Sequence, residues 1–360
     1  MNQIKVLIID DSALVRQTLK AILESDPEIR VLGTAGDPYI AVQKIHKEKP
    51  DVITLDIEMP KMDGLTFLQK LMRQAPMPVV VISNQTVNGA RIGLQALEAG
   101  AVDVITKPKL GTDIHSEESR INLIDKVKSA FIAGKKWTAK ETSGIGSTAG
   151  HSSAGQPALV KKCSLSHDTV IAIGASTGGT EAIKTFLTTL PPSMPPILIV
   201  QHMPEKFTAS FAKRLNESCS LTVKEAQNNE TVHANTVYIA PGDHHMRILR
   251  KGAQKVIQIT KGELVSRHRP SVNVLFNSVA ECVGKNAIGI IMTGMGDDGA
   301  SEMVSMHKKG AYTIAQDEES SVVFGMPHKA ILKGGVTSVL SLNAIAYAVC
   351  RILDKDIREG

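Results

Sequence analysis

Thr169-Val170-Ile171-Ala172-Ile173 is followed directly by Gly174-Ala175-Ser176-Thr177-Gly178-Gly179, so an apolar run leads into a glycine-rich turn. The run predicts a buried strand, and the turn predicts the start of a helix. Such a turn lifts the hydroxyl of Ser176 above the sheet edge, where it can act as a nucleophile beside backbone N–H groups. Turns of this kind also bind the phosphates of nucleotides, so the turn alone leaves both functions open.

The composition predicts an α/β protein of two domains. The chain has 360 residues, of which 42% are apolar and only 3% aromatic, so branched aliphatic side chains and alanine must fill its cores. A net charge of +5, spread along the chain, does not predict nucleic-acid binding. Four cysteines without paired spacing, no apolar run of about 18 residues and no secretory signal predict a reduced, cytoplasmic protein.

Strand and helix patterns alternate in a first domain over residues 1–133. Short apolar runs mark the strands and amphipathic stretches the helices, with runs at 6–9, 52–55, 79–82 and 102–105, helices at 13–25 and 89–99, and a final helix over 121–133. The following segment lacks periodicity and is rich in serine and glycine between residues 143 and 155. It predicts a flexible linker over 134–167.

A second domain over residues 168–360 repeats the alternation. Strands are expected at 197–200 and 288–292, and helices at 207–215 and 272–282. Residues 237–259 read as strands joined by turns, which predicts an antiparallel excursion. We therefore expect an α/β fold with two doubly wound parallel sheets joined by the linker.

Acidic residues end two predicted strands of the first domain, and a lysine ends a third. Asp10 and Asp11 follow the first strand, Asp56 ends the third, and Lys107 ends the fifth. Because the carboxyl ends of parallel strands share one edge, these groups converge there. Clustered carboxylates repel one another unless a cation lies among them, and oxygen ligands suit Mg²⁺. Lys107 and the hydroxyl of Ser83 would then contact an added phosphoryl group.

This set resembles the receiver domain of two-component response regulators over residues 1–125. The resemblance implies a flavodoxin-like fold, phosphorylation of Asp56 by a histidine kinase, and Mg²⁺ held by Asp10, Asp11, Asp56 and the backbone of Glu58. Many receivers carry an aromatic residue three positions before the lysine. Here that residue is Val104, which argues against coupling through an aromatic switch.

Three strand ends decide between the two functions of the second domain's turn. Ser176 follows one strand, His202 follows the next, and the pair Asp297-Asp298 follows a later one. Serine, histidine and carboxylate on one rim are what nucleophilic acyl transfer needs, since the imidazole takes the hydroxyl proton and the carboxylate fixes its tautomer. A dinucleotide site would instead need an acidic residue where Gln201 and His202 stand.

The residues alone leave some assignments open. His244-His245 and Arg267-His268-Arg269 offer rival histidines, although the second group is a basic patch better suited to an anionic group or to positioning substrate. The spacing does not choose between Asp297 and Asp298.

Residues 169–353 resemble the catalytic domain of the CheB family of chemotaxis protein-glutamate methylesterases. The matching motifs are Ile173–Thr180, Gln201–Pro204, Ala240–Asp243, Arg267–Val272 and Thr293–Gly299. The resemblance implies a Rossmann-like domain in which Ser176 is the nucleophile, His202 the base and Asp298 the triad acid. Backbone N–H groups of Thr177 and Met295 would bind the oxyanion, and His268 would lie near the substrate. Asp297, where many relatives have asparagine, adds a negative charge beside the triad.

The family implies hydrolysis of glutamyl methyl esters, and deamidation of glutamines, on the cytoplasmic domains of methyl-accepting chemotaxis receptors. A chemotaxis histidine kinase would phosphorylate Asp56 and so activate the esterase. No cofactor is expected for the esterase step, and the membrane would be reached only through the receptors. The alternative is a response regulator with a DNA-binding output domain, which predicts a shorter second segment with a concentrated basic face.

Overall fold

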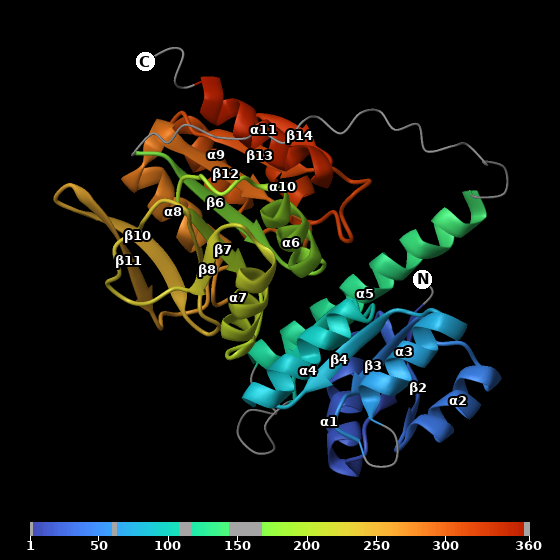
Figure 1. Cartoon of the computed structure of the whole chain (residues 1–360). Helices are drawn as coiled ribbons and strands as arrows, with labels where there is room; N and C mark the ends of the chain where they lie inside the picture. The colour runs from blue at the N-terminus through green and yellow to red at the C-terminus, as the bar shows by residue number, and fades with distance from the viewer. Residues whose placement is uncertain (1–2, 60–62, 108–116, 144–167, 356–360) are drawn as a thin grey trace. The chain divides into compact units, whose positions relative to one another are not determined.

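A computed structural model describes residues 3–59, 63–107, 117–143 and 168–355 (Figure 1). The chain divides into two compact units, Met1–Ser147 and Thr148–Gly360. Each unit has its own parallel sheet and is described by itself below.

The first unit has a five-stranded parallel sheet with the order β2-β1-β3-β4-β5. Its elements are β1 (Ile4–Ile9), α1 (Ala13–Glu24), β2 (Ile29–Ala35), α2 (Pro38–Lys47), β3 (Val52–Asp56), α3 (Gly64–Gln74), β4 (Val79–Ser83), α4 (Val87–Glu98), β5 (Asp103–Thr106) and α5 (Glu117–Ser143). This is the strand order of flavodoxin-like doubly wound folds, so the predicted fold class is confirmed.

Burial and capping explain these elements. Every residue of β3 and β4 is buried, as expected for central parallel strands covered on both faces. Helices α1 to α4 begin at side chains that accept hydrogen bonds from their first free N–H groups, namely Ser12, Asp37, Asp63 and Thr86.

Helix α5 extends beyond its predicted end at Ala133 and continues to Ser143, through the first residues of the predicted linker. Gly134, where the predicted linker begins, lies inside the helix and serves close packing, because a Cβ there would lie 2.3 Å from Cγ of Pro78. The residues that follow it in sequence are mostly helix formers, which lets the helix continue. The rest of the predicted linker, 144–167, lies outside the described residues.

The second unit has a seven-stranded parallel sheet with the order β14-β13-β12-β6-β7-β9-β8. Its strands are β6 (Val170–Ala175), β7 (Ile197–Gln201), β8 (Thr222–Glu225), β9 (Thr236–Ile239), β12 (Ala287–Ile291), β13 (Tyr312–Gln316) and β14 (Ser338–Leu340). Its helices are α6 (Gly179–Thr189), α7 (Phe207–Ser218), α8 (Val272–Cys282), a 3-10 turn (Gly284–Asn286), α9 (Ala300–Lys308), α10 (Met326–Leu332) and α11 (Leu342–Lys355).

The antiparallel part is smaller than predicted. Strands β10 (His245–Lys251) and β11 (Gln254–Thr260) form a separate antiparallel pair. Residues 237–239 belong instead to β9, which pairs parallel with β7 and with the short β8. The parallel pairing of β9 was not predicted from the sequence, because β9 has only four residues and β8 has little apolar character.

The sheet order places the site of the second unit. Strand β6 is central, and the chain leaves it toward β7 on one side and returns through β12 on the other, which makes a topological switch point at its carboxyl end. Helix α8 packs on β6, β7 and β10 through a buried apolar face that includes Val272, Leu275 and Phe276.

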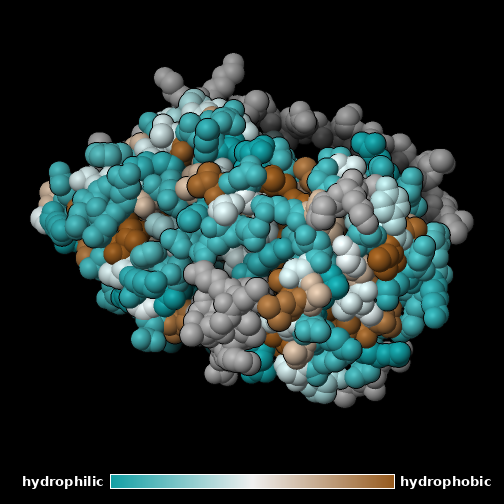
Figure 2. Space-filling model, turned by 90° about the horizontal axis from the view of Figure 1, so that it is seen from below, coloured by the Kyte–Doolittle hydropathy of each residue, from teal (hydrophilic) through white to brown (hydrophobic). Residues whose placement is uncertain are grey.

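The surface seen in Figure 2 is mostly hydrophilic, with hydrophobic residues in scattered patches. Among the described residues, no helix has both the length and the apolar character needed to cross a membrane.

Candidate functional site

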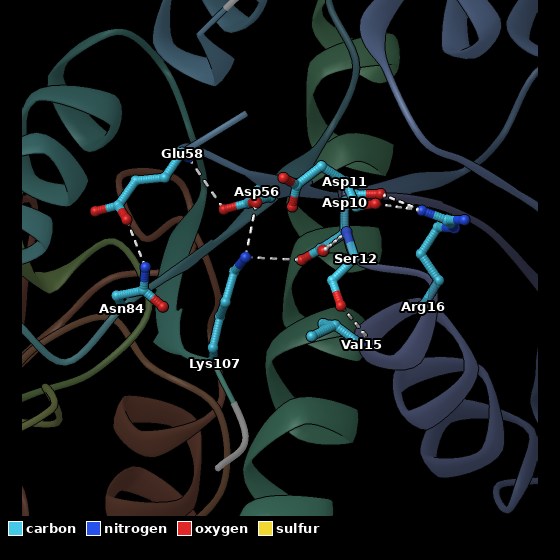
Figure 3. Close-up of polar contacts among 9 residues, drawn as sticks. All are labelled: Asp10, Asp11, Ser12, Val15, Arg16, Asp56, Glu58, Asn84 and Lys107. Carbon is cyan, nitrogen blue, oxygen red and sulfur yellow. Dashed lines mark hydrogen bonds and ion pairs between the residues drawn. The ribbon is translucent and has the colours of Figure 1, made fainter. Parts of the chain in front are cut away.

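The predicted carboxylate cluster forms at the carboxyl edge of the first sheet (Figure 3). One oxygen from each of Asp10, Asp11 and Asp56 lies within 4.8 Å of the others. Asp10 and Asp56 are fully buried, whereas Asp11 is exposed. Of these three residues, Asp11 is therefore the one that is accessible to solvent.

Lys107 neutralises part of this charge. Its Nζ lies 2.7 Å from Oδ2 of Asp56 and 3.2 Å from Oδ2 of Asp10. Burial raises the pKa of Asp56 to about 6, against the opposing effect of Lys107. Burial also raises the pKa of Asp10 above its usual range. Two buried carboxylates with raised pKa values show that one lysine does not fully compensate them.

The cluster fits a divalent cation. All its donors are carboxylate oxygens, and Oδ2 of Asp10 has the ion pair with Lys107 but no well-aligned hydrogen bond among the described residues. A hard cation such as Mg²⁺ satisfies such oxygens and offsets their repulsion. The N–H of Glu58 donates to Oδ1 of Asp56 at 3.1 Å, which places the backbone of Glu58 beside the cluster as predicted. Its side chain bonds with Asn84.

Ser83 lies buried at the end of β4, next to the strand that ends in Asp56. Its hydroxyl donates to the carbonyl of Gly89 at 3.0 Å. The described structure gives it no hydrogen bond with Asp56, so its contact with a phosphoryl group stays a prediction.

Ser176 is held by its backbone from three sides. Its N–H donates to the carbonyl of Thr293 at 3.0 Å, after β12. Its carbonyl accepts from the N–H of Gly179 at 2.7 Å and from Nε2 of Gln201 at 2.9 Å. These bonds fix the turn between β6 and α6 against both neighbouring strand ends, and Ser176 itself is only 4% exposed.

Two glycines around the turn are required by close approach. A Cβ on Gly174 would lie 2.2 Å from the side chain of Val272, and one on Gly294 would lie 2.7 Å from Cβ of Ser176. The glycines thus let α8 pack against the end of β6 and let the loop after β12 approach Ser176.

His202 and Asp298 form a buried pair on the same rim. Nε2 of His202 lies 2.9 Å from Oδ2 of Asp298, and the two residues are 8% and 1% exposed. The N–H of His202 donates to the carbonyl of Ala175 at 3.1 Å, which extends the pairing of β6 with β7 up to the nucleophile. With Nε2 on the carboxylate, Nδ1 is the nitrogen left for a proton from Ser176. Nδ1 is buried without a hydrogen-bond partner among the described residues.

Asp298 lies at the N-terminus of α8, which decides between the two aspartates. It accepts hydrogen bonds from the N–H groups of Val272 at 2.6 Å and Asn273 at 3.0 Å, and from Oγ of Ser271 at 2.8 Å. The positive end of the helix dipole favours the charged carboxylate. Asp297 is exposed and has no part in this pair.

The predicted oxyanion donors, Thr177 and Met295, both lie close to Ser176. Thr177 directly follows Ser176, and its carbonyl accepts from Oγ1 of Thr293 at 2.9 Å. Met295 directly follows Gly294, where an added Cβ would lie 2.7 Å from Cβ of Ser176. The N–H of Met295 forms no hydrogen bond within the described parts of the chain, so it is available to an oxyanion.

The rival histidines have other partners. His245 is buried, with Nε2 donating to the carbonyl of Glu263 at 2.8 Å and Nδ1 accepting from the N–H of Ser271 at 3.2 Å. Burial lowers its pKa. His268, predicted near the substrate, stacks on the ring of His202 with centroids 3.8 Å apart.

The basic patch serves structure in part, because Arg269 donates to Asp243 and to the carbonyl of Gly262. Gln201 and Ser271 were not predicted as site residues, although Gln201 donates to the carbonyl of Ser176 and Ser271 donates to Asp298. Ser271 could have been found as the polar residue that immediately precedes a predicted helix. Gln201 could have been found only from the known position of His202.

Comparisons with known proteins identify the family of each unit. The family model described as CheB methylesterase matches residues 171–349, and the one described as response regulator receiver domain matches residues 6–117. The match over 171–349 covers most of the second domain, and no DNA-binding output domain is evident.

Relatives match over nearly the full length. A protein-glutamate methylesterase/protein-glutamine glutaminase of Geobacter metallireducens is 52% identical over 98% of this chain and 99% of its own. One of Rhizobium johnstonii is 52% identical over 97% and 98%. The solved catalytic domain of the Thermotoga maritima CheB methylesterase is 37% identical, covers 51% of this chain and 98% of its own, and has a TM-score of 0.50. The chain therefore belongs to the CheB family of protein-glutamate methylesterases, in which a response regulator receiver domain precedes the methylesterase domain.

Proposed function

We propose that this protein hydrolyses glutamyl methyl esters, and deamidates glutamines, on the cytoplasmic domains of chemotaxis receptors. The observation that carries the proposal is the His202–Asp298 pair, 2.9 Å long and buried, on the rim that carries Ser176. The names of the full-length relatives supply the substrate class.

The reaction begins with attack of Oγ of Ser176 on the ester carbonyl carbon, while Nδ1 of His202 takes the hydroxyl proton. Asp298 stabilises the imidazolium through Nε2. Backbone N–H groups of Thr177 and Met295 bind the oxyanion of the tetrahedral intermediate. The proton then passes to the leaving methoxide, and methanol departs from an acyl-enzyme.

Water completes the cycle. His202 takes a proton from a water molecule, which attacks the acyl carbon, and Ser176 recovers its proton as the glutamate is released. A glutamine side chain has nearly the shape of the methyl ester, so the same steps release ammonia from it. This gives both activities one site.

The first unit controls the second by phosphorylation of Asp56. Asp10, Asp11, Asp56 and the backbone of Glu58 would hold Mg²⁺, which when bound supplies charge neutralisation for the incoming phosphoryl group. The carboxylate of Asp56 is the acceptor, and Lys107 pairs with the added charge. The phosphodonor is a chemotaxis histidine kinase, and the receptors are the only link to the membrane.

The experiment measures methanol release from methylated receptor membranes by the full chain, with acetyl phosphate and Mg²⁺ present. We expect the wild type to release methanol and Ser176→Ala to release none while keeping its fold by circular dichroism. Equal release by the two proteins would overturn the proposal.

A further inference from the structure

His268 lies flat against the ring of the base. The two imidazole centroids are 3.8 Å apart and the ring planes are 18° from parallel. His202 comes from the end of β7, whereas His268 comes from the turn that precedes α8, so the fold brings them together from distant parts of the sequence. His268 is half-buried and His202 is buried, so the stacked ring covers one face of the base.

The His268 turn, residues 265–269, has an unfavourable backbone. Ser266 and Arg267 have φ angles of 52° and 66°, in the left-handed region that residues other than glycine seldom adopt. Two backbone hydrogen bonds close the turn. The N–H of Val265 donates to the carbonyl of His268 at 3.2 Å, and the N–H of His268 donates to the carbonyl of Val265 at 3.0 Å. Such strain persists where the surroundings demand it, and it concentrates at functional sites.

Side chains fix both ends of the His268 turn. The guanidinium of Arg269 donates to Asp243 at 2.8 and 2.5 Å and to the carbonyl of Gly262 at 2.7 Å. Nδ2 of Asn273, in α8, donates to Oγ of Ser266 at 2.9 Å. The turn therefore has little freedom to carry His268 away from the base.

The base needs a restraint of this kind. The torsion between Cβ and the ring of a histidine is broad, and a single hydrogen bond at Nε2 does not fix the tilt of the ring. Asp298 supplies that one bond, and Nδ1 has no partner among the described residues. A second ring against the face of the imidazole restricts its tilt without occupying the nitrogen that must accept the proton.

We propose that His268 is a positioning residue, which holds the imidazole of His202 in the orientation in which Nδ1 can take the proton of Ser176. This rests on the proposed function and deepens it, since His268 then acts through the base and not by contact with substrate. It also explains why a strained turn is anchored so firmly beside the triad.

The test compares His268→Ala with His268→Phe, which keeps a flat ring but no polar atom. The matched control is His307→Ala, because His307 is an exposed histidine at the far end of α9. Full chains are assayed with acetyl phosphate and Mg²⁺ for methanol release from methylated receptor membranes, and for the rate at which a fluorophosphonate labels Ser176. Circular dichroism and thermal unfolding establish that each variant folds.

We expect His268→Ala to lower kcat and the labelling rate about tenfold with KM within about twofold, since misplacing a catalytic group costs rate and not affinity. His268→Phe should restore most of the loss, and His307→Ala should match the wild type. A loss that His268→Phe does not restore, or a change confined to KM, would overturn the stacking role. If His268→Ala leaves kcat unchanged while Ser176→Ala abolishes activity, only this inference is overturned. If Ser176→Ala also leaves activity unchanged, the proposed function itself is overturned.

Discussion

At the residue scale, Asp298 and Asp297 adjoin in the sequence but differ in burial and in bonding. Asp298 is 1% exposed and accepts from His202, Ser271, Val272 and Asn273, whereas Asp297 is exposed. The contrast between these carboxylates is one of position, because only Asp298 reaches the first turn of α8.

Asp298→Asn keeps the shape of the side chain but removes its charge and one acceptor oxygen. We expect kcat to fall by about 10³–10⁴, because the amide no longer stabilises the imidazolium or selects its tautomer. Stability should fall by about 1–3 kcal/mol, since a buried donor at the start of α8 loses its acceptor. Kinetics of methanol release and urea unfolding measure the two effects. The matched change Asp297→Asn should leave kcat within about twofold, and an equal loss in both variants would contradict the assignment.

His245 gives the second unit a pH-dependent stability. Burial lowers its pKa below the ordinary value of 6.5, so the unfolded chain binds this proton more readily than the folded one. The stability that neutral His245 contributes is therefore complete above pH 6.5 and is lost as the pH falls below that value. In His245→Gln an amide can accept from Ser271 and donate to Glu263 without titrating. The free energy of unfolding, measured with urea, should decrease less from about pH 8 to about pH 5 for the variant than for the wild type. Parallel curves would contradict this role of His245.

At the element scale, helices place the reactive groups by their ends and by their closest approaches. The N-terminus of α8 holds Asp298, and the N-terminus of α6 follows the turn that holds Ser176. Helix α5 also makes a close approach, because its Gly134 lies directly against Pro78, which precedes β4.

Gly134→Ala tests that contact, since two effects of opposite sign compete. Alanine favours a helix over glycine by about 1 kcal/mol, but its Cβ would lie 2.3 Å from Cγ of Pro78. We expect overpacking to dominate and the first unit to lose about 1–3 kcal/mol in urea unfolding. Pro78→Ala removes the obstructing ring, so Gly134→Ala in that background should be neutral or stabilising. A stabilising effect in the wild-type background would show that α5 does not approach Pro78 as described.

At the scale of the whole molecule, the two units divide the chemistry between them. The first holds Asp56, the proposed acceptor, beside Lys107, and the second holds the proposed triad of Ser176, His202 and Asp298, so a variant can separate regulation from hydrolysis. Asp56→Asn cannot form the acyl phosphate. We expect the ratio of methanol release with and without acetyl phosphate to fall to about one. Removal of Mg²⁺ with EDTA should have the same effect on the wild type, and activation that survives Asp56→Asn would contradict the proposal.

Much of this arrangement could be predicted because strand ends are readable in the sequence. The apolar runs before Asp10, Asp56, Ser176 and His202 place those groups on two rims, and the structure confirms the strands. The stacking of His268 on His202 and the role of Gly134 could not be predicted, since they depend on contacts between segments far apart in sequence. The short strands β8 and β9 were missed or misassigned because four residues show too little periodicity.

Asp298 has one further consequence for the timing of proton movement. Two donors reach each of its oxygens: His202 and Val272 at Oδ2, and Ser271 and Asn273 at Oδ1. Such a carboxylate has no vacant lone pair in its plane, so an incoming proton would have to displace a donor. In the proposed reaction the imidazole must therefore keep the proton that it takes from Ser176, so only one proton moves in the transition state. Rates of methanol release in mixtures of light and heavy water should vary linearly with the deuterium fraction, and a bowed plot would reveal a second moving proton.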